Sequence, residues 1–165
     1  MNFADKAILF SDVAEMLLKK QIGTAEVVDD KPWGGYFVIN ENDKTRFIQE
    51  FYPELDETLF GENRISPKIL LVAPEKRLSW QYHFRRAESW KLIGGEAYVA
   101  RSLDDEEQEK QALILQEKIE LQQGERHRLI GGSCWGVVAE IWQHTDSEHP
   151  SDEADIVRVQ DDFGR

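Results

Sequence analysis

The chain has 165 residues, of which 41% are apolar and 32% are charged, a composition that fits one globular domain with a single core. The formal net charge of −12 argues against nucleic acid and anionic membrane surfaces as partners, because both are negatively charged. Cys134 is the one cysteine, which excludes a disulfide within the chain and favours a reducing compartment. The apolar run at residues 7–10 is too short for a signal peptide or a membrane span, so we expect a cytoplasmic protein.

One helix is predicted near the N-terminus, at residues 11–21. Apolar side chains such as Val13 and Leu17 share one face of that helix, and the Ser-Asp pair at residues 11–12 can cap its start. Gly23 ends the helical pattern. The rest of the chain has no strand–helix alternation, which argues against a parallel sheet.

Short β-rich segments separated by turns make up the remainder, and Gly94 and Gly95 predict a hairpin turn. Many short antiparallel strands with glycine turns predict an all-β sandwich or small barrel. The predicted strand segments are residues 34–40, 45–52, 68–73, 78–84, 89–93, 96–100, 112–116, 118–122, 126–130 and 134–143.

Positive charge is concentrated in residues 68–91, which contain six basic and two acidic residues and so have a local charge of +4. One interpretation is a basic surface strand. The other is a pocket for a small anion such as a sugar phosphate.

Four polar side chains have the spacing of a metal site. Gln81 and His83 are two residues apart, so they project from the same face of a strand. Glu88 has the wrong parity for one straight strand, and we expect a bend near residues 85–87 that returns it to that face. His127, at the start of a later strand, can supply a fourth ligand. Each residue alone is more often a surface or structural residue, but the set offers ligand types for a divalent first-row metal.

Six ordered motifs resemble the cupin domain of type II mannose-6-phosphate isomerases. They include the pattern K-x5-P-x3-L-S-x-Q-x-H from Lys68 to His83, and the resemblance covers residues 31–165. The other motifs are KPWGGY (31–36), RAESW (86–90), GGEA (94–97), GERHRL (124–129) and DIVRVQDDFGR (155–165). Phe84, Arg85 and Ser89 depart from the histidines usual there, and residues 52–63 look like an insertion.

The resemblance implies a cupin double-stranded β-helix, a jelly-roll barrel, with a short N-terminal helix. It divides the chain into an N-terminal helical extension (1–30) and a cupin domain (31–165). It also implies a mannose-6-phosphate isomerase-like enzyme that interconverts mannose 6-phosphate and fructose 6-phosphate. One divalent ion would be held by Gln81, His83, Glu88 and His127. Zinc is the first choice, and manganese, iron, cobalt or nickel also fit such ligands.

The isomerase reaction also needs a phosphate-binding cation and a base that moves a proton. The sequence candidates for phosphate binding are Lys68, Arg86, Arg158 and Arg165. Arg86 has a second interpretation, as a clamp on Glu88. Lys91 and Glu140 are the candidates for the base, because their strands are expected to flank the pocket.

Three alternatives and one assembly prediction remain open at this stage. The chain could be a cupin isomerase for another sugar, an oxygenase, or a non-catalytic sugar-binding or regulatory cupin, since one fold supports many chemistries. We expect a homodimer, with residues 3–18 either covering a sheet surface or packing on the partner.

Overall fold

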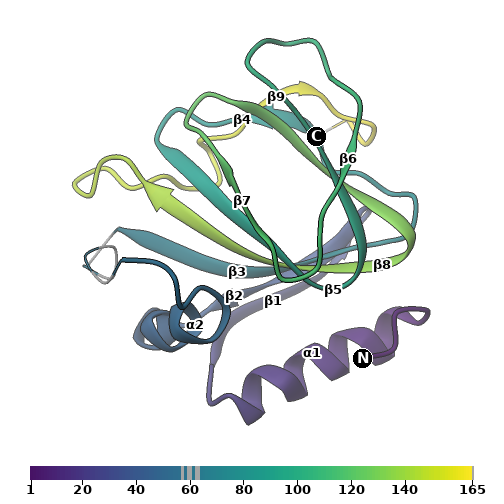
Figure 1. Ribbon diagram of the computed structural model, residues 1–165, viewed down its shortest axis with the longest axis vertical. Coiled ribbons are helices and arrows are strands. Elements are labelled where there is room, and N and C mark those ends of the chain that lie inside the picture. The colour runs from purple at the N-terminus through teal and green to yellow at the C-terminus, as the bar shows by residue number, and fades with distance from the viewer. Residues whose placement is uncertain (57, 59–60, 62–63, 165) are drawn as a thin grey trace.

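The computed structural model describes residues 1–56, 58, 61 and 64–164. These residues form a nine-stranded antiparallel sheet that curls on itself, with the helices on one side (Figure 1). The strands pair in the order β1-β2-β3-β8-β4-β9, and β5 pairs with β6, β7 and β8. The elements are α1 (Lys6–Lys19), β1 (Thr24–Lys31), β2 (Gly34–Ile39), η1 (Glu41–Asp43), α2 (Lys44–Phe51), β3 (Ile65–Val72), β4 (Trp80–Tyr82), β5 (Arg86–Ser102), β6 (Gln111–Ala112), β7 (Lys118–Leu121), β8 (Arg126–His144) and β9 (Val157–Gln160). The predicted all-β architecture with a short N-terminal helix is confirmed.

The central strands separate two apolar cores. On β8, Val137, Ala139 and Ile141 pack in the core that lies between the sheet and the helices. Val138 belongs instead to the core inside the curled sheet, because successive side chains of a strand point to opposite faces. Glu140 and Trp142 share the face of Val138 and therefore point into the interior, where the candidate site lies.

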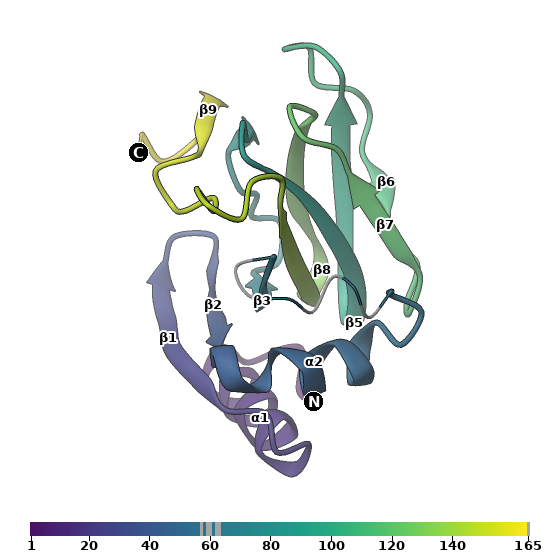
Figure 2. The same cartoon turned by 90° about the vertical axis from the view of Figure 1, so that its left-hand side faces the viewer.

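Helix α1 starts five residues earlier than predicted, at Lys6 instead of residue 11. Its cap is Asp5, whose side chain accepts a hydrogen bond from the backbone N–H of Ile8 at 2.9 Å. Leu9, Val13 and Leu17 are buried against the sheet. The N-terminal segment thus covers a sheet surface of its own chain, as Figure 2 shows for α1 and α2 below the strands.

The strand predicted at residues 45–52 is wrong, because these residues form α2 and its C-terminal cap. Phe47, Ile48 and Phe51 are buried on one helical face. Their spacing is that of a helix, and burying this face against the sheet outweighs the β preference of the aromatic residues.

The predicted hairpin at Gly94 and Gly95 is also wrong, since β5 continues through both as one strand with irregular register. A side chain at Gly95 would place its Cβ 1.8 Å from the carbonyl oxygen of Trp135, so the glycine allows β5 and β8 to approach closely. The two long strands remain paired from Arg86 opposite His144 to Ser102 opposite Arg126.

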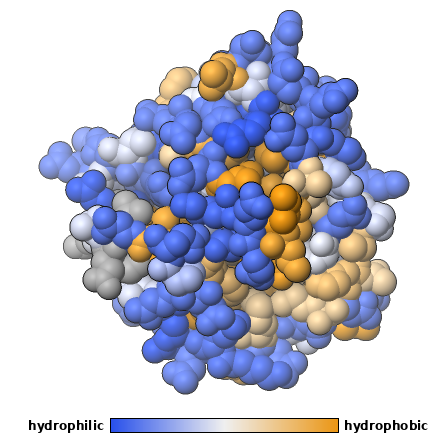
Figure 3. Space-filling view, viewed as in Figure 1, coloured by the Kyte–Doolittle hydropathy of each residue, from blue (hydrophilic) through white to orange (hydrophobic). Residues whose placement is uncertain are grey.

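The predicted division at residue 30 falls within β1, which pairs with β2, and it stays a prediction. Among the described residues, the helices are too short and too polar to cross a membrane. Figure 3 shows a mainly hydrophilic face with a small apolar group near its centre, in keeping with a chain that is 32% charged.

Candidate metal centre

Three of the four predicted metal ligands meet inside the curled sheet. His83 follows β4, Glu88 lies on β5 and His127 lies at the start of β8. His83 Nε2 is 3.1 Å from Glu88 Oε1 and 3.3 Å from His127 Nε2, and His127 Nε2 is 3.4 Å from Glu88 Oε2. All three side chains are at most 2% exposed. The group has the composition and closeness of a metal site.

A bend in the chain brings Glu88 to the two histidines. Strand β4 ends at Tyr82 and β5 begins at Arg86, so the chain turns within residues 83–85, where the odd spacing predicted a bend. On the other side, Gln81 is the backbone partner of His127 in the β4–β8 pair. Strand pairing therefore places the two sequence-distant motifs against each other.

The Nδ1 hydrogen bonds of the two imidazoles direct both Nε2 atoms toward Glu88. His83 Nδ1 lies 2.9 Å from the backbone oxygen of Asp155, and His127 Nδ1 lies 2.9 Å from the backbone oxygen of Glu125. A carbonyl oxygen only accepts, so each Nδ1 carries a proton, and a ring in its neutral form has its lone pair at Nε2. The two Nε2 atoms lie 3.3 Å apart beside a carboxylate, as ligands of one cation would, and the Arg86 guanidinium lies 3.1 Å from the Nε2 of His83. This donor set fits a divalent metal ion.

The electrostatics favour the deprotonated forms that a metal needs. Burial lowers the pKa of His83, although the charge of Glu88 opposes that shift. Burial alone would raise the pKa of Glu88, but His83, His127 and Arg86 hold it well below its usual range. The expected state is a carboxylate facing an imidazole that loses its proton easily.

Gln81, the fourth predicted ligand, lines the cavity next to this group. Its side-chain oxygen accepts a hydrogen bond from Ser79 Oγ at 2.6 Å. An amide oxygen has two lone pairs, so one stays available for a metal. Its role as a ligand stays a proposal.

Arg86 lies against the metal ligands and most of its N–H donors are in use. Its Nε donates to Glu88 Oε1 at 2.8 Å, and its Nη1 donates to Ser151 Oγ at 2.8 Å and to the backbone oxygen of Asp152 at 3.2 Å. Nη2 is 3.1 Å from His83 Nε2, and the side chain is 2% exposed. Of the two sequence interpretations of Arg86, this geometry favours the clamp on Glu88.

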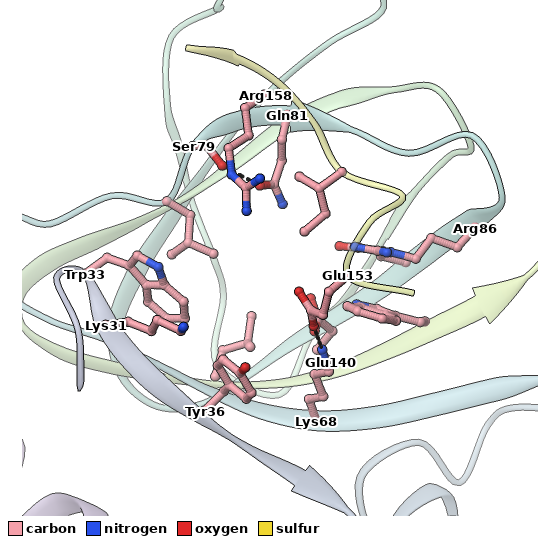
Figure 4. Close-up of a pocket in the computed structure, with 15 residues that line it drawn as sticks. Lys31, Trp33, Tyr36, Lys68, Ser79, Gln81, Arg86, Glu140, Glu153 and Arg158 are labelled. Carbon is pink, nitrogen blue, oxygen red and sulfur yellow. Dashed lines mark hydrogen bonds and ion pairs between the residues drawn. The ribbon is translucent and has the colours of Figure 1, made fainter. Parts of the chain in front are cut away.

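A cavity of about 270 Å³ adjoins the centre (Figure 4). Glu88, Gln81 and Arg86 form part of its wall, so the centre can be reached from it. The other lining residues are Lys31, Trp33, Tyr36, Lys68, Leu70, Leu78, Ser79, Glu140, Trp142, Glu153, Ile156 and Arg158.

The predicted phosphate-binding cations differ in their surroundings. Lys68 lies in the cavity, where its Nζ donates to Glu153 at 2.6 Å and lies 3.5 Å from the ring centre of Trp142. Arg158 also lines the cavity and, within the described part of the chain, has no ion-pair partner. Arg165 lies outside the described residues.

The two candidate bases lie on opposite sides of the sheet. Glu140 faces the cavity, and its Oε1 accepts a hydrogen bond from Trp90 Nε1 at 3.0 Å. Burial, and then the charge of Glu88, raises its pKa to about 8. Lys91 projects from the other face of β5, where its Nζ is 3.1 Å from Glu54 and 4.9 Å from the ring centre of Tyr52. Because Lys91 does not line the cavity, Glu140 is the better candidate.

Sequence reasoning missed the contribution of residues 151–155, the end of the β8–β9 connection. Ser151 and Asp152 bind Arg86, Glu153 binds Lys68, and Asp155 binds His83. The match of residues 155–165 to a family motif was the available signal, but it gave no indication that the preceding residues reach the site.

The model of the mannose-6-phosphate isomerase C-terminal family matches residues 52–161. Vicilin from Solanum lycopersicum (tomato) has a similar fold, with a TM-score of 0.54 and 12% identity over 81% of this chain and 35% of that chain. KdgF from Halomonas sp. has a TM-score of 0.52 and 9% identity over 74% of this chain and 91% of that one. A recombinant oxalate oxidase in complex with glycolate has a TM-score of 0.46 and 20% identity over 58% of this chain. A comparison with curated protein sequences gives no match.

The fold is therefore that of the cupin superfamily, as the motifs predicted. The chain belongs to the mannose-6-phosphate isomerase C-terminal family. It spans less than half the length of the oxalate oxidase chain, of which it covers 46%.

Proposed function

We propose that this protein is a metal-dependent aldose–ketose isomerase of sugar phosphates, with mannose 6-phosphate and fructose 6-phosphate as the first substrates to test. The observation that carries the proposal is a buried His83, Glu88 and His127 group beside a cavity that also holds Glu140. Such a site combines metal ligands with a carboxyl group able to exchange protons near neutral pH.

The reaction moves one proton from C2 of the open-chain aldose to C1, through an enediol, while a hydroxyl proton moves between the two oxygens. The metal, when bound, would polarise the carbonyl and adjacent hydroxyl groups. Glu140 is proposed as the group that takes and returns the carbon-bound proton. Its pKa of about 8 suits this task, because both protonation states are accessible at neutral pH.

Other residues would hold the metal ligands and the substrate in place. Arg86 keeps Glu88 ionised and oriented, and Trp90 fixes one oxygen of Glu140. For the phosphate group we propose Arg158 together with Lys31, since these two cavity cations have no carboxylate partner among the described residues. Lys68 is a further candidate once Glu153 moves away from it.

The test is a coupled isomerase assay on a panel of hexose and heptose phosphates. The protein is first stripped with a chelator and then reloaded separately with zinc, manganese, iron, cobalt or nickel. Activity that is lost with the metal, restored by it and reduced in Glu140→Gln would support the proposal. Stoichiometric sugar-phosphate binding without turnover under every metal would replace it with a non-catalytic sugar-binding cupin, and oxygen consumption with turnover would indicate an oxygenase.

A further inference from the structure

We propose that Asp155 is a positioning residue for the metal centre, and that it sets metal affinity by fixing His83. Asp155 lies 72 residues from His83 in the sequence and is 6% exposed. It is not one of the four predicted ligands. Its contacts hold both the ring of His83 and the backbone that follows it.

The backbone of Asp155 orients the imidazole. Its carbonyl oxygen lies 2.9 Å from His83 Nδ1 and so accepts the ring proton there. This contact directs the lone pair of Nε2 toward Glu88 and His127. A rotation of the ring by a few tens of degrees would move Nε2 away from the point that the three ligand atoms share.

The carboxylate of Asp155 holds the bend that carries His83. Its Oδ1 accepts from the backbone N–H of Phe84 at 3.1 Å, and its Oδ2 accepts from that of Arg85 at 2.9 Å. These N–H groups lie between β4 and β5, outside the two strands. Without the carboxylate the bend loses both acceptors, so the backbone that follows His83 is held less firmly.

The same carboxylate also reaches the clamp on Glu88. Ser151 Oγ donates to Asp155 Oδ2 at 2.6 Å and accepts from Arg86 Nη1 at 2.8 Å. Asp155 is thus joined to two metal ligands, directly to His83 and through Ser151 and Arg86 to Glu88. Loss of such outer contacts typically lowers metal affinity by about 10–100-fold.

The main variant is Asp155→Asn, which keeps the size but can accept from only one of the two backbone N–H groups. Its zinc affinity, measured by competition with a chromophoric chelator, should fall by about 10–100-fold. The visible absorption of the cobalt-loaded variant should also change, because that spectrum reports the position of the ligands around the ion. The full chain is used, without sugar, so the result does not depend on whether the protein proves to be an isomerase.

Asp146→Asn is the matched control. Asp146 lies on the same β8–β9 connection, and its Oδ1 accepts from the backbone N–H groups of Glu148 and His149, but within the described part of the chain it contacts none of the metal ligands. This variant should keep wild-type zinc affinity and the wild-type cobalt spectrum. An equal loss of affinity in both variants would mean general loosening of the connection and would overturn the proposal, as would an unchanged Asp155→Asn.

A milder variant covers the case in which Asp155→Asn does not fold. Ser151→Ala removes only the bridge from Asp155 to Arg86, and one hydrogen bond is worth about a 2–10-fold change in affinity. Circular dichroism of the metal-free proteins establishes that each variant is folded. If Ser151→Ala binds zinc as tightly as the wild type, the proposed link from Asp155 to Glu88 is wrong.

Discussion

Glu88 and Glu140 share one indole N–H, since Trp90 Nε1 lies 3.1 Å from Glu88 Oε2 and 3.0 Å from Glu140 Oε1. The two buried carboxyl groups have opposite pKa shifts. His83, His127 and Arg86 hold the pKa of Glu88 low despite its burial. Burial and the charge of Glu88 raise the pKa of Glu140 to about 8. Neighbouring carboxyl groups whose environments push their pKa values apart are typical of sites in which the two groups have different roles.

Glu140→Gln should stabilise the metal-free protein within a defined pH window. The pKa of Glu140 is raised from 4.5 to about 8, so between these values the unfolded chain releases a proton that the folded protein keeps. The free energy of unfolding therefore falls as pH rises through this window and levels off above it. The variant lacks this titration. The difference between its free energy of unfolding and that of the wild type, measured with urea, should therefore grow as the pH rises from 4.5 to about 8. An advantage that is independent of pH would show that Glu140 does not titrate there.

If the protein is the isomerase proposed above, the same variant should inactivate its metal-loaded form. If Glu140 moves the carbon-bound proton, kcat should fall by about 10²–10⁴-fold with unchanged metal content. Solvent deuterium incorporation into recovered substrate measures the proton transfer directly. Lys91→Gln is the control, because its side chain lies on the other face of β5, and full activity in Glu140→Gln would remove Glu140 from the mechanism.

Removal of the metal or of one ligand should act on stability through the bound ion. Metal that binds only the folded state stabilises it by mass action, so a chelator should lower the Tm of the wild type. His127→Ala should bind the ion weakly and should show no response to the chelator. In a crystal structure of the zinc form, the ligand distances should be about 2.0–2.2 Å. Ligand side chains pointing away from a common ion would contradict the assignment.

Arg86→Ala should remove the metal instead of acting on the phosphate alone. Arg86 pairs with Glu88 at 2.8 Å and both side chains are 1–2% exposed, so truncation leaves a buried carboxylate without its partner. Breaking such a pair costs about 3–5 kcal/mol of stability. Elemental analysis and urea unfolding measure the two effects. Full metal content with weakened sugar-phosphate binding would restore the phosphate-binding interpretation of Arg86.

Arg158→Gln and Lys31→Gln should weaken binding of sugar phosphates and leave unphosphorylated mannose unaffected. A decrease of about tenfold in affinity is expected for each, equivalent to about 1.4 kcal/mol. Glu153→Gln should act in the opposite direction, because it frees Lys68 from its ion pair at 2.6 Å. Isothermal titration calorimetry on the metal-loaded proteins tests all three. Equal losses for mannose and its phosphate would mean that these residues do not recognise the anion.

The sequence by itself determined the class of fold and the identity of three side chains that meet. The alternating strand pattern and the spacing of Gln81, His83 and Glu88 depend on the local geometry of a strand, in which every second side chain shares a face. His127 followed from its place at the start of a later strand, and the family motifs added the cupin barrel. These inferences rest on the spacing of residues close together in the sequence or on a known family motif. Both are visible in the sequence without a structure.

Only the tertiary structure decided which charged residues are engaged and which are free. Arg86, Lys68 and Lys91 are similar basic residues in one basic stretch, yet their partners Glu88, Glu153 and Glu54 lie at very different sequence distances. The same holds for α2, whose helical form follows from burial against the sheet, and for Asp155, which reaches His83 across 72 residues. The physical reason is that burial and electrostatic pairing depend on distance in space, which the local sequence pattern does not contain.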